Sequence, residues 1–246
     1  IKNIVFYPYY KNLNMKKTFL FISLTFFLSV VGVNAQEVLT ASGGANITIE
    51  KNAGMYVYGG MALEKNSFLR NEGTVVIVKT NKSSADFADN TEDHYNYGPG
   101  KFIFYGVGTQ NIRTNNQIGF IEVDNKGLNL LSDISVNNWN LKNGTVNTGS
   151  FYAVSTNAGN DGISAAGDNI NFSNSWFNGN LRQYIIPANV NSYVLPVGDA
   201  YRVKICEMTN LSQNPLTGVK YINVSFNRPQ GLTDGLKATE NGLNYK

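Results

Sequence analysis

The chain has 246 residues, of which 12% are aromatic and 15% charged, and it contains one cysteine, Cys206, and one histidine, His94. A single cysteine excludes an intramolecular disulfide framework, and a single histidine argues against histidine-based catalytic triads and multi-histidine metal sites. The formal net charge is +3, but residues 1–35 hold four lysines and no acid, so the remainder carries −1 and offers no electrostatic footprint for nucleic acid.

The first methionine, Met15, opens a pattern typical of a secretory signal peptide. Two lysines follow it, then the apolar run FLFISLTFFLSVVGV and the small-residue ending Asn34-Ala35. The apolar run is shorter than the roughly 20 residues that a membrane-spanning helix needs. We therefore expect a signal peptide at 15–35, an upstream translated segment at 1–14, and a secreted or outer-surface chain with no transmembrane segment after cleavage.

Residues 36–180 alternate short apolar segments with turns rich in Asn and Gly. The clearest example is GLNLLSDISVNNWNLKNGTVNTG at 127–149, where no apolar segment is long enough for an amphipathic helix. Similar turns at Asn52 and Asn71, and again at Asn125 and Asn143, indicate a repeat of 18 to 20 residues. Such a repeat predicts the coils of a β-solenoid, whose stacked Asn side chains can hydrogen-bond along its axis.

An ordinary β-sandwich with hairpin connections is the open alternative for this region. Short apolar segments and turns do not by themselves decide between parallel and antiparallel pairing. Residues 79–100 interrupt the repeat with the polar, acidic sequence NKSSADFADNTEDHYNYGPG, which predicts an inserted, exposed loop.

Residues 181–246 show longer and more regular apolar alternation. Side chains of one parity are apolar in two segments: Tyr201, Val203 and Ile205 in the first, and Ile222, Val224 and Phe226 in the second. Strands with one polar and one apolar side are typical of a half-solvated antiparallel sheet. The predicted fold is therefore all-β, with a parallel β-helix-like solenoid followed by a β-sandwich-like antiparallel unit that ends incomplete.

An acidic group in the predicted loop is a candidate Ca²⁺ site. Hard cations bind several carboxylate and carbonyl oxygens, although the spacing of these acids does not match an EF-hand. The alternative interpretation is a solvated acidic loop that binds no ion. No cofactor other than Ca²⁺ is expected. The candidate ligands are Asp86, Asp89, Glu92 and Asp93.

Tyr56 and Tyr58 form a candidate ligand-binding pair. They share a parity opposite to that of Met55 and Val57, so one of the two pairs must face solvent. Outward tyrosines would form a flat platform for stacking on sugar rings, whereas inward tyrosines would pack across neighbouring coils.

Parallel β-helices also include polysaccharide lyases and hydrolases, which use clustered carboxylates from neighbouring coils. Each available aspartate lies beside a turn, where Asp is expected for turn chemistry. The aspartates in question are Asp124, Asp133, Asp161 and Asp168.

Four segments in order resemble repeat modules of secreted and surface-attached adhesin-like proteins of Bacteroidetes, of the type exported by type IX secretion. They are GPGKFIFYGVGTQNI, IGFIEVDNKGLNLLSDISVNNWNLKNGTVNTG, NGNLRQYI and YVLPVGDAYRVKI. The resemblance covers about Gly98 to Phe226 and implies solenoid and sandwich regions at the cell surface, with no catalytic residue to carry over. The C-terminal sorting domain of such proteins is not visible after Phe226, so we expect a truncated fragment.

The predicted function is a non-catalytic, secreted or cell-surface, adhesin-like module that contacts extracellular glycans or other cell-surface components. A carbohydrate-active β-helix enzyme, either lyase or hydrolase, and a glycan-binding accessory module are the alternatives.

Overall fold

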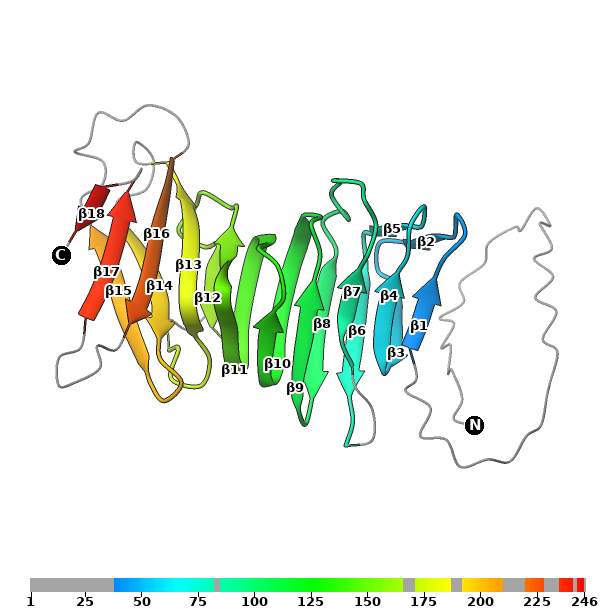
Figure 1. The fold of residues 1–246 in the computed structure, drawn as a ribbon, viewed down its shortest axis with the longest axis horizontal. Helices are drawn as coiled ribbons and strands as arrows, with labels where there is room; N and C mark the ends of the chain where they lie inside the picture. Colours follow the sequence, from blue (N-terminus) through cyan, green and yellow to red (C-terminus); the bar gives the residue numbers. More distant parts are fainter. Residues whose placement is uncertain are drawn as a thin grey trace. The chain divides into compact units, whose positions relative to one another are not determined.

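The computed structural model describes residues 38–81, 85–165, 171–186, 192–209, 220–227, 235–240 and 243–245. All regular structure in these ranges is β-strand, and about seven turns of a parallel β-solenoid follow one another along the chain (Figure 1). The prediction of an all-β solenoid is therefore confirmed. The predicted upstream segment 1–14 and signal peptide 15–35 lie outside the described residues.

One side of the solenoid, the β1 face, is a series of parallel strands that each pair with a strand one turn further along. The series contains β1 (Val38–Ala41), β4 (Gly60–Leu63), β7 (Phe87–Asp89), β9 (Thr109–Arg113), the end of β10 (Ile118–Leu130), the middle of β11 (Ile134–Ser155) and the start of β13 (Phe177–Ile185). Met61, Phe87, Ile112 and Leu130 stand in register and are buried. Repetition of one inward position thus builds a continuous core.

A second series, the β3 face, contains β3 (Gly54–Tyr58), β6 (Thr74–Lys79), β8 (Lys101–Gly106), the first part of β10, the first part of β11 and β12 (Ile163–Ala165). Its inward column includes Phe102, Ile121 and Trp139, all fully buried. The intervening residues point outward, because side chains alternate along a strand. Between these two faces, β2 (Asn46–Ile49) pairs in parallel with β5 (Phe68–Asn71).

A ladder of asparagines runs along the outside of the β1 face. Asn129 donates its Nδ2 to Asn111 Oδ1 at 2.9 Å, Asn147 donates to Asn129 at 2.9 Å, and Asn178 donates to Asn147 at 3.0 Å. The first two steps span 18 residues each and the third spans 31. Asn side chains therefore do stack between turns of the solenoid, but they lie on strands rather than at the predicted Asn turns. The predicted repeat of 18 to 20 residues holds for the central turns and for the step from β3 to β6, where Gly54 pairs with Thr74.

Residues 79–100, predicted as an inserted loop, belong to the solenoid instead. They contain β7, which pairs in parallel with β4 and β9. Tyr97 is fully buried, and its carbonyl accepts a hydrogen bond from the Asn71 amide at 2.6 Å. The loop prediction is wrong because this acidic segment contains a three-residue strand. The one inward carboxylate of that strand, Asp89, is hydrogen-bonded inside the protein.

Most pairings after the start of β13 are antiparallel, as the alternation predicts, although Phe177 and Asn178 of β13 pair in parallel with Val197 and Gly198. β13 pairs with β16 (Lys220–Asn227), β14 (Ser192–Gly198) with β15 (Val203–Thr209), β16 with β17 (Gly235–Glu240), and β17 with β18 (Leu243–Tyr245). The predicted boundary at 180/181 falls inside β13, and these strands all belong to the same sixteen-stranded sheet as the solenoid. A separate β-sandwich is therefore not confirmed.

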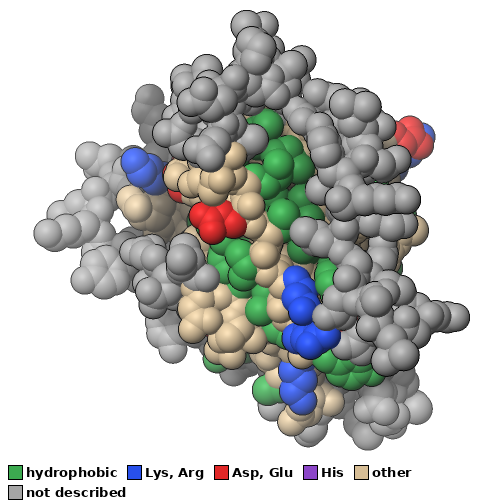
Figure 2. Space-filling model, turned by 90° about the vertical axis from the view of Figure 1, so that its left-hand side faces the viewer, with side chains coloured by type: hydrophobic (Ala, Val, Ile, Leu, Met, Phe, Trp, Pro, Cys, Tyr) green, Lys and Arg blue, Asp and Glu red, His purple; other side chains and the backbone are tan. Residues whose placement is uncertain are grey.

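The inward residues of this antiparallel region match the prediction on one strand and differ on another. Ile222, Val224 and Phe226 are buried on β16, but Tyr201 is 80% exposed and Ile205 is 48% exposed. On β15 it is Cys206, opposite Leu195, that turns inward. Figure 2 looks onto the end of the stack that carries β14 to β18, where hydrophobic side chains gather on the described surface with Lys and Arg side chains beside them.

Candidate functional site: the outer surface of the β3 face

Tyr56 and Tyr58 point away from the core on β3, with 60% and 57% of their surfaces exposed. Val57 between them is buried and Met55 packs against the core, so the tyrosines are the outward pair. Tyr58 is in register with Val78 on β6, and Val78 is in register with Tyr105 on β8. Tyr105 is 50% exposed. Two strand spacings place the backbones of Tyr58 and Tyr105 about 10 Å apart.

The space between these tyrosines is apolar. The residues on this side of the intervening strands are Val78 on β6 and Ile103 on β8, together with Val76 on β6, which is only 6% exposed. Together with Tyr56, Tyr58 and Tyr105 they form what we call the tyrosine patch. Within the part of the chain that the structure describes, none of the three rings stacks on another aromatic ring or a cation. Their faces are therefore available to a ligand.

A charge cluster borders the tyrosine patch on β10 and β11. Lys142 Nζ lies 3.1 Å from Glu122 Oε1 and 3.2 Å from Asp124 Oδ2, and Lys101 Nζ lies 3.4 Å from Glu122 Oε2. The hydrogen bond to Glu122, reinforced by Asp124, raises the pKa of Lys142 and keeps its amine charged. Two lysines thus neutralise two carboxylates. No sequence pattern points to Glu122, Lys101 or Lys142.

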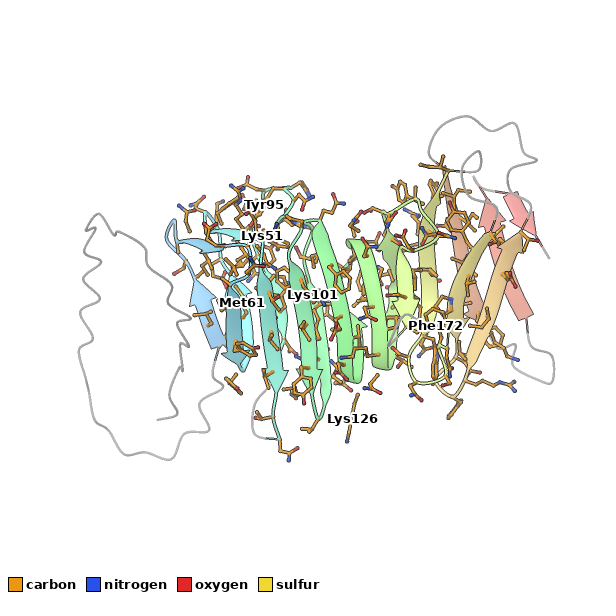
Figure 3. The ribbon with its side chains drawn as sticks, turned by 180° about the vertical axis from the view of Figure 1, so that it is seen from behind. Lys51, Met61, Tyr95, Lys101, Lys126 and Phe172 are labelled. Carbon is orange, nitrogen blue, oxygen red and sulfur yellow. The ribbon has the colours of Figure 1, made fainter. Side chains whose placement is uncertain are left out.

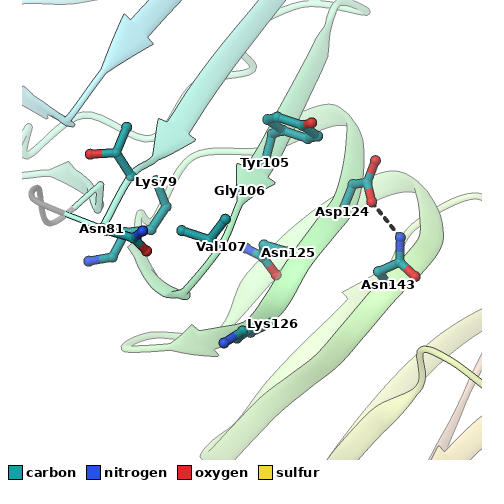
Figure 4. Close-up of a pocket in the computed structure, with 10 residues that line it drawn as sticks. Lys79, Asn81, Tyr105, Gly106, Val107, Asp124, Asn125, Lys126 and Asn143 are labelled. Carbon is teal, nitrogen blue, oxygen red and sulfur yellow. Dashed lines mark hydrogen bonds between the residues drawn. The ribbon is translucent and has the colours of Figure 1, made fainter.

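An open hollow lies where the β3 face meets the turns leading to the β1 face. Its lining comes from the end of β6 and the two residues after it (79–81), the end of β8 and the residue after it (105–107), the bend in β10 (124–126) and Asn143 on β11 (Figure 4). Asn143 donates its Nδ2 to Asp124 Oδ1 at 2.6 Å. Tyr105 thus belongs both to the tyrosine patch and to this hollow.

Buried amides support the bend beneath the hollow. Asn125 donates its Nδ2 to Gln110 Oε1 at 2.7 Å, and its own Oδ1 accepts the Gly127 amide at 2.8 Å. Gln110, fully buried, donates to the carbonyls of Ile77 and Ala85 at 3.0 and 2.8 Å. Because these polar groups are all paired, the backbone of the hollow is held rigidly.

The four predicted Ca²⁺ ligands occupy different surroundings. Asp86 accepts both the backbone amide and Nδ2 of Asn111 at 2.9 Å and so ends the asparagine ladder. Glu92 forms an exposed ion pair with Lys65 at 2.9 Å, and Asp93 is exposed. Asp89 is buried in a separate network. Among the described residues, no group of three or more acidic, His or Cys side chains is arranged to hold a metal ion.

Asp89 is the centre of a polar network inside the solenoid. Its Oδ1 accepts the amide of Thr91 at 2.8 Å and the Thr91 hydroxyl at 2.6 Å. Its Oδ2 accepts Thr114 Oγ1 at 2.8 Å, Asn116 Nδ2 at 2.6 Å and the hydroxyl of Tyr97. Burial, followed by the nearby Asp89 charge, raises the pKa of Tyr97, so its hydroxyl stays protonated and donates. All five donors are protein groups.

The aspartates considered for catalysis are dispersed. Asp161 accepts Asn157 Nδ2 at 3.1 Å, a local pairing within a turn, whereas Asp133 accepts the amide of Tyr152, 19 residues further along the chain, at 2.9 Å. Asp168 lies outside the described residues. Of the three aspartates that the structure describes, Asp124 shares an ion-pair partner, Lys142, with another carboxylate, Glu122.

Comparison of the chain with protein-family models, with curated proteins and with solved structures gives no match. The tyrosine patch, the charge cluster and the hollow must therefore be interpreted from their own chemistry.

Proposed function

We propose that this chain is a non-catalytic, adhesin-like module of a secreted or cell-surface protein, and that it contacts extracellular glycans through the tyrosine patch. The signal-peptide pattern at 15–35 supports an extracytoplasmic location. Among the described residues there is no helix with the length and hydropathy to cross a bilayer. A solenoid without disulfides also suits a repetitive scaffold, because each turn is stabilised by its neighbours.

The observation that carries this proposal is the exposure of Tyr56, Tyr58 and Tyr105 on one rigid sheet. Large exposed aromatic side chains grouped on a surface are typical of interaction sites. A sugar ring has an apolar face of C–H groups that can cover a tyrosine ring, while its hydroxyls stay in water. Strand pairing fixes the tyrosine backbones before binding, so little conformational entropy is lost.

Replacement of both Tyr56 and Tyr58 by alanine is expected to weaken glycan binding at least tenfold, which corresponds to about 1.4 kcal/mol. Two rings lose their contact with the sugar, whereas the core column behind them is untouched. Binding of the purified chain to a panel of polysaccharides, measured by biolayer interferometry, tests this expectation.

The matched control is the Tyr56→Phe and Tyr58→Phe double variant, which keeps the rings and removes the hydroxyls. It should retain most of the affinity. A glycan that binds the alanine variant as tightly as the original chain would remove the tyrosine patch from the proposal. A chain that retains no glycan from the panel would contradict the proposed function itself.

The Glu122 and Asp124 pair keeps a carbohydrate-active enzyme as the second candidate. Two carboxylates on one side of one strand are the groups that glycoside cleavage requires. Their common ion pair with Lys142 favours a structural role, because it occupies an oxygen of each carboxylate. Polysaccharide turnover that disappears in the Glu122→Gln variant, while the variant remains folded, would favour the enzyme over the adhesin-like module.

A further inference from the structure

We infer that the hollow at Lys79, Tyr105 and Lys126 is a subsite for an anionic sugar residue, such as a uronate or a sulfated sugar. This inference rests on the proposed contact with glycans and names the class of glycan. It concerns residues that neither the sequence patterns nor the tyrosine patch identify: the two lysines at the end of the β3 face.

The charge of the hollow is the first argument. Its one acidic side chain, Asp124, is already bound to Lys142 at 3.2 Å and to Asn143 at 2.6 Å. Lys79 and Lys126 take part in none of the ion pairs among the described residues. The uncompensated charge that faces the hollow is therefore positive, although the chain after residue 35 carries −1 overall. A carboxylate or sulfate complements this charge.

The lysine positions are the second argument. The stem of Lys79 lies across Gly108, where an added Cβ would come within 3.1 Å of both Lys79 Cγ and Cε. Gly106 has φ +130°, and a Cβ there would lie 2.1 Å from the Lys79 carbonyl oxygen. These two glycines let the turn after β8 pass beneath Lys79. Lys126 follows the buried Asn125 and projects from the edge of the stack (Figure 3).

The apolar wall of the hollow is the third argument. Tyr105 and Val107 are each 50% exposed, and both line the hollow between the two lysines and the Asp124–Asn143 pair (Figure 4). A bare phosphate or sulfate ion needs no such wall, whereas a sugar ring does. Two lysines beside an exposed tyrosine therefore favour a sugar whose ring stacks on the tyrosine and whose carboxylate or sulfate contacts the lysines.

The subsite also adjoins the tyrosine patch. Tyr105 belongs to both, and strand register aligns it with Tyr58 two strands away. One oligosaccharide can therefore contact Tyr58 and Tyr105 and place an anionic residue between Lys79 and Lys126. Contacts with several rings of one chain add up through high effective concentration.

The test uses three probes: a hexuronate oligosaccharide, its neutral methyl ester, and a sulfated oligosaccharide. The original chain should bind the free acid at least tenfold more tightly than the ester, and the difference should shrink as salt rises. In the Lys79→Gln and Lys126→Gln double variant, the acid and the ester should bind equally. If the double variant weakens binding of the sulfated probe but not of the hexuronate, the subsite is assigned to sulfate rather than carboxylate. That result still supports an anionic sugar.

Two control variants keep the inference falsifiable. Lys51→Gln with Lys65→Gln changes the net charge equally at exposed positions outside the hollow, and Lys51 lies at the opposite edge of the stack (Figure 3). This control should keep the preference for acid over ester. The Lys79→Arg and Lys126→Arg variant should keep it as well, which separates charge from misfolding.

The outcomes distinguish this inference from the proposed function. The anionic subsite is overturned, and the glycan contact left standing, when acid and ester bind the original chain equally and the sulfated probe binds the Lys79→Gln and Lys126→Gln double variant as tightly as the original chain. A preference lost equally in the Lys51 and Lys65 control indicates non-specific electrostatics and also overturns the subsite. Absence of binding to every probe and to the polysaccharide panel contradicts both.

Discussion

Replacement of Trp139 by alanine is expected to lower the free energy of unfolding by about 3 to 5 kcal/mol. Trp139 is fully buried in the column that joins Ile121 to Ile163, and its ring meets Phe177 edge-on at a centroid distance of 5.3 Å. Its Nε1 donates to the Val154 carbonyl at 3.3 Å. The substitution leaves a cavity between consecutive turns and removes the side-chain hydrogen bond to the Val154 carbonyl.

Urea unfolding followed by far-UV circular dichroism measures this loss without relying on the fluorescence of the removed indole. Trp139→Phe should cost less than Trp139→Ala, since an aromatic ring remains against Phe177. Tyr201→Ala is the control, and because Tyr201 is 80% exposed its effect should stay within about 0.5 kcal/mol. A loss below about 1 kcal/mol in the alanine variant would contradict the central place of Trp139 in the core.

The solenoid can be predicted because the pattern of each turn is local. In 127–149 the apolar parity, the Asn and Gly turns and the 18-residue spacing all fall within one coil, and the preceding step from Asn111 to Asn129 has the same spacing. The asparagine ladder follows from the same spacing, since equivalent positions of neighbouring turns lie one strand spacing apart. Within these regular turns, periodicity therefore predicts both the inward positions and the spacing of the ladder.

Solenoid turns that depart from the regular repeat cannot be predicted from local periodicity. β7 has three residues, Phe87–Asp89, and lies inside the polar stretch that predicts a loop, while its partner β9 follows only after β8. Nothing local shows that Asp89 finds five donors inside the protein. Likewise, the alternation of β13 to β18 predicts antiparallel pairing but not that these strands extend the sheet of the solenoid.

For a similar reason, the sequence predicts the tyrosine pair of the candidate site but not its charge cluster. Parity places Tyr56 and Tyr58 on one side of β3 but does not say which side meets solvent. The charge cluster depends on a register shift between Val123 and Asp124, where Asp124 lies opposite Asn143 and Lys142 becomes the extra residue. An irregularity of this kind brings Lys142 between Glu122 and Asp124, and periodic spacing cannot predict it.

Replacement of Asp89 by alanine is the second change with a large expected effect, a loss of about 3 kcal/mol or more in the free energy of unfolding. The five groups that donate to this carboxylate lose their acceptor, and all lie in the buried interior around Tyr97. Some of the loss is recovered because Thr114 Oγ1 and the Tyr97 hydroxyl, 2.9 Å apart, can pair with each other. The Thr91 amide loses its hydrogen bond to Asp89 Oδ1.

The Asp89→Asn variant separates shape from charge. It keeps the volume and one acceptor oxygen but turns an amide N–H₂ toward groups that also donate, so we expect a smaller loss than for alanine, still clearly above zero. Hydroxyls of Thr91 and Thr114 can rotate to accept, whereas Asn116 Nδ2 cannot. Asp93→Asn is the exposed control and should change stability by less than about 0.5 kcal/mol.

Repeating these unfolding curves with and without excess Ca²⁺ decides between the two roles considered for this acidic segment. A ligand that binds only the folded chain raises its stability by an amount set by ligand concentration and affinity. If Asp89 serves the protein network alone, Ca²⁺ leaves its variants and the original chain equally unaffected. If Asp86, Asp89, Glu92 and Asp93 rearrange around a cation, Ca²⁺ stabilises the original chain and Asp89→Ala abolishes that gain. The five existing hydrogen bonds to Asp89 favour the first result, because a cation would have to displace donors that are already paired.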